Sequence, residues 1–272
     1  MMPRISRCFS RAYNPCVRTP AAGFIVIAAA GLCATLSAQP LDRLTGRVLT
    51  EQGQPLKDAD IRVEALFGFA GSDYLGQRTF TARTDGKGLW ALLGFKSGIW
   101  IFDASLPGHV PDAVALPFNL VVPAGAGLSG VVPVWRPVLK PTPLPPGDYG
   151  QLLSDAAEAA RAGRPDRVAP LLARVSDTTD AAILDAAGRI CLLMRDGAVA
   201  RPFFRRALDR DPMWFRAALG MGSTALMQRD VDAAGRAFSD ARALTKDKDE
   251  RTYLSAAISE LNKAHNVMRG TY

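Results

Sequence analysis

The chain has 272 residues, of which 48% are hydrophobic and 22% charged, so its composition is that of a globular protein with room for two domains. Much of the net charge of +7 comes from four arginines in residues 1–38, where there is no acid; the rest of the chain holds 29 basic and 26 acidic residues. No run of lysines and arginines follows, which argues against a nucleic-acid-binding protein.

Residues 1–38 are predicted to be an export signal. Arginine-bearing residues precede an apolar run rich in Ala and Gly at 21–38, and the small residues Ser37 and Ala38 stand just before Gln39. That run is about long enough to span a bilayer, so an uncleaved N-terminal anchor is the alternative. The segment predicts a protein exported to the periplasm, cell envelope or medium, which touches a membrane only if the segment is retained.

Cysteine placement agrees with export, because Cys8, Cys16 and Cys33 all lie in this first segment. The remaining chain has only Cys191, and a single cysteine forms no disulfide framework and no cysteine-based metal site. Cys191 stands in the apolar run "ICLLM", so we expect it to be buried.

Residues 42–138 are predicted to be strands. Short alternating runs, separated by Gly, Pro, Asp and Asn, are typical of an all-β antiparallel sandwich. The runs lie at 44–50, 60–66, 78–85, 88–95 and 98–106. "LWALLGF" and "GIWIF" are predicted to be paired strands, with "TDGKG" as the turn before them. No helix follows these glycines, so they do not form a phosphate-binding loop.

The motifs of this half resemble the carboxypeptidase regulatory-like family. "GRVLTEQGQPLKDADIRVEA" (46–65) is similar to its opening G-x-V, its G-x-P-L turn and its A-x-V-x-V strand. "TDGKGLWALLGFKSGIWIF" (84–102) resembles its second signature, and "LPGH" (106–109) its small turn. The resemblance covers 44 to about 138. It implies an Ig- or transthyretin-like sandwich of about seven strands, and it implies no peptidase activity.

Two groups of aromatic residues are expected to differ in role. Those of the strands should fill the core, because a small sandwich needs large side chains there; they are Trp90, Phe95, Trp100 and Phe102. An aromatic insertion at 67–77 joins two strands, and such loops carry function more often than strands do. The residues of this predicted recognition loop are Phe67, Phe69 and Tyr74.

Five prolines within residues 136–148 exclude a helix there and stiffen the chain. We therefore predict a Pro-rich linker at 139–147, between the sandwich at 42–138 and a helical domain at 148–268.

The helical domain contains a repeat. Gly188, Ala200, Phe204 and Ala207 recur thirty-four residues on, as Gly222, Ala234, Phe238 and Ala241. This spacing resembles the tetratricopeptide repeat family, in which each unit is a pair of antiparallel helices. Small Gly and Ala residues let the helices approach, and Phe fills the gap. A degenerate pair is expected at 149–175 and a capping helix at 249–268, which completes an all-α solenoid.

The concave face is the usual partner groove of that family. By the repeat register, it should be lined by Asp185, Arg189, Leu193, Arg216, Ser223 and Met227. The two arginines suit a carboxylate or an acidic peptide, whereas a solvated arginine face is the alternative.

Catalytic motifs are absent from the sequence. It has two histidines, no H-E-x-x-H pair, no P-loop and no G-x-S-x-G elbow. Asp58 and Asp60 lack the loop pattern of a calcium site. We therefore predict no catalytic residue, no metal site and no cofactor.

The sequence predicts a non-enzymatic exported adaptor or scaffold, which binds a protein or peptide partner through the concave face in a cell-envelope assembly. The alternative is a carbohydrate- or cell-wall-binding module that uses exposed aromatic residues of the sandwich.

Overall fold

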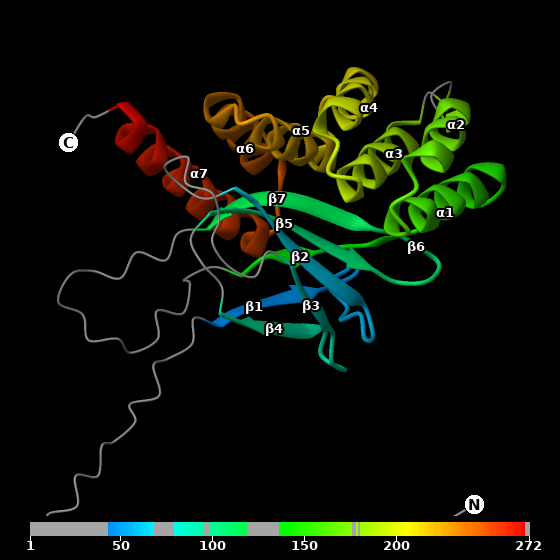
Figure 1. The fold of residues 1–272 in the computed structure, drawn as a ribbon, viewed down its shortest axis with the longest axis horizontal. Helices are drawn as coiled ribbons and strands as arrows, with labels where there is room; N and C mark the ends of the chain where they lie inside the picture. The colour runs from blue at the N-terminus through cyan, green and yellow to red at the C-terminus, as the bar shows by residue number, and fades with distance from the viewer. Residues whose placement is uncertain are drawn as a thin grey trace, which may run out of the picture. The chain divides into compact units, whose positions relative to one another are not determined.

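A computed structural model describes residues 43–67, 79–94, 98–118, 136–175, 178 and 180–269 (Figure 1). All of them belong to one compact unit, Ala38–Tyr272. The predicted signal at 1–38, the loop residues Phe69 and Tyr74, and the core candidate Phe95 lie outside the described residues.

The first half of the described chain consists of strands, as expected. They are β1 (Arg43–Val48), β2 (Asp60–Phe67), β3 (Thr79–Arg83), β4 (Leu89–Leu93), β5 (Gly98–Ser105), β6 (His109–Val110), β7 (Asp112–Phe118), β8 (Val138–Leu139) and β9 (Thr142–Pro143). They form three small sheets, with the orders β3-β2-β5-β7, β4-β1-β8 and β6-β9. All pairs are antiparallel except β1–β8, which is parallel.

The "TDGKG" turn is present, but the pairing predicted after it is wrong. Asp85 accepts hydrogen bonds from the N–H groups of Lys87 and Leu89, at 2.8 and 2.9 Å, and Gly88 has φ 67°. β4 then pairs with β1, whereas β5 pairs with β2 and β7. The physical reason is burial: every residue of β5 is buried, so this strand takes the centre of the largest sheet.

The second half consists of helices. They are α1 (Asp148–Arg161), α2 (Pro165–Val175), α3 (Ala181–Leu193), α4 (Gly197–Arg210), α5 (Phe215–Met227), α6 (Val231–Leu244) and α7 (Lys248–Arg269). Asp196 and Asp230, thirty-four residues apart, cap α4 and α6 by accepting from the N–H groups of Val199 and Ala233. No helix of the described part is long and apolar enough to cross a membrane.

The predicted packing of the repeats is confirmed. A Cβ placed on Gly188 or Gly220 would lie 2.7 or 2.4 Å from ring carbons of Phe204. A Cβ on Gly222 would lie 2.3 Å from ring carbons of Phe238. Real Cβ atoms do not come so close, so glycine is what lets Phe204 pack between α3 and α5 of neighbouring pairs, and Phe238 pack against α5 within its own pair.

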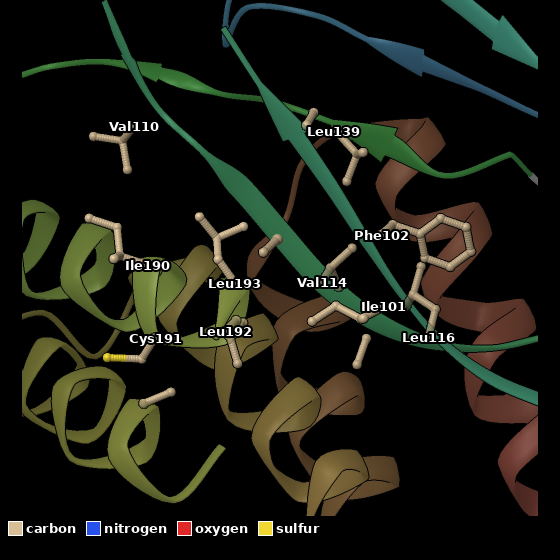
Figure 2. Packing of buried hydrophobic residues seen from close by; sticks show 14 of the residues in the cluster. Ile101, Phe102, Val110, Val114, Leu116, Leu139, Ile190, Cys191, Leu192 and Leu193 are labelled. Atoms are coloured by element: carbon tan, nitrogen blue, oxygen red, sulfur yellow. The ribbon is translucent and has the colours of Figure 1, made fainter. Parts of the chain in front are cut away.

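Helices α3, α5 and α7 all contact β7, and Figure 1 shows α3 and α5 above this strand. β7 is the edge of its sheet, and all of its residues are buried. Its small residues Ala113 and Ala115 leave room for a close approach. One continuous hydrophobic core therefore includes side chains from both halves, and Figure 2 shows members of it from β5, β7 and α3.

The Pro-rich segment is not the extended linker that its composition predicted. Val138–Leu139 forms β8 beside β1, and Thr142–Pro143 forms β9 beside β6. Lys140 between them is buried. Proline excludes a helix, yet its extended backbone suits a short edge strand, so the same composition yields a folded connection. The strands and the helices are thus packed together rather than held apart.

Candidate functional site

The six predicted groove residues lie on α3 and α5, two helices that both contact β7; Arg189, Arg216 and Ser223 bond residues of that strand. Asp185 and Ser223 are fully buried, and Arg189 and Leu193 nearly so; the side chain of Arg216 is 12% exposed, and Met227 is partly buried. The concave face of the repeats is therefore filled by the chain's own sheet.

The two predicted arginines do meet a carboxylate, but it belongs to the same chain. Asp112, the first residue of β7, places Oδ1 3.8 Å from Arg189 Nη1 and 3.5 Å from Arg216 Nη1. Its Oδ2 accepts a hydrogen bond from the N–H of Lys140 at 2.6 Å. Arg189 also donates to Oγ1 of Thr142 at 3.1 Å. Asp112 thus joins both helices to β7 and to the Pro-rich segment.

Asp185 adds a second carboxylate to this network. Its Oδ2 lies 3.0 Å from Arg189 Nε, in an ion pair whose geometry is too poor for a hydrogen bond. Burial raises the pKa of Asp185 above its ordinary value, although the charges of Arg189 and Arg216 oppose this. Burial also lowers the pKa of Arg189. Because both side chains are buried, this ion pair presents no charged group to solvent or to a ligand.

Ser223 closes the edge of the sheet. Its Oγ accepts the N–H of Ala115 at 3.0 Å and donates to the carbonyl of Leu219 at 3.2 Å. Because N–H groups alternate in direction along a strand, Pro117 occupies the next position that points toward the same edge. Proline has no N–H, so the free edge of β7 exposes no unsatisfied donor at these two positions.

An ionic cluster that sequence reasoning missed joins the Pro-rich segment to α7; Lys140 and Glu250 are buried in it, and Asp247 is partly exposed. Lys140 Nζ lies 2.7 Å from Asp247 Oδ2 and 2.6 Å from Glu250 Oε1. Burial alone would lower the pKa of Lys140, but hydrogen bonds to both carboxylates hold it above its ordinary value. Burial would raise the pKa of Asp247, but hydrogen bonds from Lys140 and from backbone N–H groups hold it lower. The sequence feature that could have indicated this cluster is Lys140, a charged residue within a segment rich in proline.

The turns after α3 and α5 reach the sheet through arginines thirty-four residues apart. Arg195 and Arg229 each have φ 61°, a backbone region in which glycine is usual. Arg195 donates to Glu64 at 3.1 Å and to Asp103 at 3.2 Å. Arg229 lies over the ring of Phe67, 4.9 Å from its centroid. Phe67, predicted as a recognition residue, therefore contacts the chain's own helical turn.

The core predictions for the strand aromatics are confirmed where the chain is described. Trp90, Trp100 and Phe102 are buried, and the Trp90 and Phe102 rings lie 6.3 Å apart. None of the three can present a face to a sugar. Cys191 is buried as expected, and burial raises the pKa of its thiol to about 12, so it stays protonated at neutral pH. Within the described ranges, no group of three His, Cys, Asp or Glu side chains is placed to hold a metal ion.

Several grooves open on the described surface outside the concave face, and two of them bear on function. The outer groove, of about 710 Å³, lies between α4, α5 and α6 on the side away from the sheet. The sheet groove, of about 470 Å³, lies between the β2, β3 and β5 strands, the turn at 106–109 and helix α1. Both have volumes in the range of ligand sites in proteins.

No protein-family profile matches this sequence, and no curated protein matches it either. Solved structures give partial likenesses. The first tetratricopeptide domain of human RPAP3 has 11% identity and a TM-score of 0.38, covering 46% of this chain and 97% of that chain. PcrH of Pseudomonas aeruginosa, in complex with the chaperone-binding region of PopD, has 19% identity and a TM-score of 0.36, covering 43% and 91%. The Yersinia enterocolitica type III secretion chaperone SycD, with a peptide of the translocator YopD, has 19% identity and a TM-score of 0.36, covering 44% and 92%.

Proposed function

We propose that the protein is a non-enzymatic, exported adaptor that binds a protein or peptide partner in a cell-envelope assembly, and that the partner lies in the outer groove. The observation that carries this proposal is the occupied concave face. With β7 in that face, a partner has to bind elsewhere on the helices.

Opening the concave face would be costly. Seven residues of β7 are in register with β5, from Asp112 to Phe118. Removing the strand would also separate Asp112 from Arg189 and Arg216, and breaking a buried ion pair costs about 3–5 kcal/mol. Such a cost is comparable with the whole stability of a domain, about 5–15 kcal/mol. The concave face is therefore a permanent internal contact.

The outer groove has the anatomy of a binding surface. Its floor includes the apolar side chains Leu208, Met221 and Leu244. Charged residues stand around it, among them Arg205 and Arg236, both exposed. An apolar centre with a polar rim is how protein interfaces exclude water and keep specificity. The groove thus fits a peptide segment that inserts apolar side chains and places polar groups at the margins.

Two further parts of the proposal rest on the sequence. The strands at 42–138 are proposed to form a carboxypeptidase regulatory-like sandwich of about seven strands, supported by the order of its motifs, and residues 148–268 form the repeat domain. Export is supported by the arginine-bearing and apolar segment at 1–38. Amino-terminal sequencing of the mature protein should begin at Gln39; a start at Met1 would contradict cleavage and leave the anchor.

The partner surface is tested by affinity capture from the envelope fraction with the full chain tagged at its C-terminus. Arg205→Glu with Arg236→Glu should abolish capture, because both residues border the groove. Arg201→Glu with Arg242→Glu is a matched control, since these exposed arginines lie on the same two helices outside the groove. Both double variants should keep the helical circular dichroism. Capture of every partner by the first variant would contradict the assignment.

A further inference from the structure

The sheet groove has a buried carboxylate at its base. Asp103 lies on β5, a strand whose residues are all buried, and its side chain is 8% exposed. Arg195 bonds its Oδ2 at 3.2 Å, whereas no hydrogen bond joins Oδ1 to any described residue. Asp103 also lines the groove. A carboxylate oxygen without a partner, at the base of a hollow, is an acceptor for a ligand that carries N–H or O–H groups.

A guanidinium stands on the wall of the same groove. Arg161 of α1 donates from Nε to Ser105 Oγ at 3.2 Å, and its two Nη atoms make no bond within the described part of the chain. Ser105 follows Asp103 by two residues, so their side chains share one face of the strand about 7 Å apart. Arg161 therefore offers its free donors in the same groove as the Asp103 carboxylate, next to Ser105 on the same strand.

The other sheet charges around the groove are already paired. Arg62, opposite Asp103, bonds Glu64 at 2.9 Å, and Asp60, opposite Ser105, bonds Arg83 at 2.8 Å. On the α1 wall, Glu158 makes no ion pair with a described residue. The groove thus has unused carboxylate oxygens and one unused guanidinium edge.

We infer that the sheet groove binds an α-amino acid group, with its ammonium at Asp103 and its carboxylate or carbonyl oxygen at Arg161. The ammonium and the carbonyl oxygen of one residue lie about 3 Å apart. With a hydrogen bond of about 3 Å at each end, such a ligand bridges an acceptor and a donor of the protein that lie up to about 9 Å apart in a straight arrangement. In a bent arrangement it bridges about 7 Å.

The walls of the groove match the rest of such a ligand. Leu106 and Leu144 line it and can cover an aliphatic side chain. No Phe, Tyr or Trp among the described residues lines it, so these residues give a sugar ring no stacking surface. The ligand is therefore an aliphatic amino acid, either free or as the first residue of a peptide. This site is separate from the outer groove and does not depend on the proposed partner.

Titration calorimetry on the full chain tests the inference with four probes. L-leucine should bind saturably, and N-acetyl-L-leucine, which has no ammonium, should bind at least about tenfold more weakly, a difference of about 1.4 kcal/mol. L-leucinamide and leucyl-glycine separate the two sources. Binding of both as tightly as leucine identifies the first residue of a peptide, and binding of leucine alone identifies the free amino acid.

Variants connect the binding to named side chains. Asp103→Asn and Arg161→Gln should each weaken leucine at least about tenfold. Arg167→Gln, an exposed arginine of α2 outside the groove, is the matched control for Arg161→Gln. The outer-groove variant, Arg205→Glu with Arg236→Glu, should bind leucine as the wild type does, so the two proposals fail separately.

Four results would overturn the inference. They are no saturable binding of leucine or leucyl-glycine up to about 10 mM, equal binding of N-acetyl-leucine, unchanged binding in Arg161→Gln, and binding of a chitin oligosaccharide in place of the amino acid. Because Arg161 is exposed, its variant stays informative even if Asp103→Asn fails to fold.

Discussion

Gly222→Ala is the sharpest test of how the repeats pack. Replacing glycine by alanine inside a helix ordinarily stabilises it by up to about 1 kcal/mol. Here the new Cβ would lie 2.3 Å from two ring carbons of Phe238, and that ring is fully buried and cannot move into solvent. Overpacking of this kind costs about 1–3 kcal/mol.

Gly235→Ala is the matched control, because Gly235 lies inside α6 and a Cβ there meets nothing within 4 Å. This variant keeps the higher helix propensity of alanine, and its new Cβ has no steric clash. We expect Gly222→Ala to be about 1–3 kcal/mol less stable than Gly235→Ala. Urea unfolding, followed by circular dichroism, measures this, provided that the slope with denaturant is unchanged.

A second substitution identifies the cause. Adding Phe238→Leu to Gly222→Ala removes the ring edge that clashes, so the double variant should cost less than the sum of the two single variants. If Gly222→Ala is as stable as Gly235→Ala, the ring does not press on this glycine and the packing reasoning is refuted.

Two further predictions concern the contact between helices and sheet. Ser223→Ala should destabilise the protein by about 1–3 kcal/mol, because the Ala115 N–H loses its acceptor inside the protein. Faster hydrogen exchange at the Ala115 amide checks this; Ser239→Ala, which loses only the bond to the carbonyl four residues earlier, is the control. Asp247→Asn should reduce the loss of folding stability at low pH. The pKa of Asp247 lies below its ordinary value, so the stability that it contributes is present above the unfolded pKa of about 3.9 and is lost as the pH falls through the folded pKa. Between pH 5 and pH 2.5 the urea midpoint of the variant should fall less than that of the wild type; equal falls would show that Lys140 does not stabilise the ionised form.

Local packing could be predicted from the sequence because its signals are local. A glycine and a phenylalanine repeated at thirty-four residues indicate which surfaces touch, and Phe204 and Phe238 do lie against the repeat glycines. Cys191 in an apolar run is buried for the same reason. In each case the residue type and its neighbours in the chain determine the environment.

The use of the concave face could not be predicted in that way. Arg189 and Arg216 suit an acidic ligand by their residue type, but nothing near them in the chain indicates that Asp112, more than seventy residues earlier, supplies the carboxylate. The linker predicted at 139–147 was wrong for a similar reason. Five prolines exclude a helix, but they do not distinguish a free spacer from short edge strands. The loop residues Phe69 and Tyr74 stay predictions, since they lie outside the described residues.

The repeat-turn arginines, Arg195 and Arg229, fix the length of this solenoid. Their contacts on β2, Glu64 and Phe67, are three residues apart, which is about 10 Å along a strand. That distance is close to the separation of packed helices, about 8–10 Å. The spacing between the two repeat turns therefore matches the distance between their two contacts on β2. In an open repeat array each unit contacts only its neighbours, so the array has no contact that sets the number of units. In this chain an inserted or deleted unit would move every later turn past its contact on the sheet, so the number of repeats is set by a strand outside them.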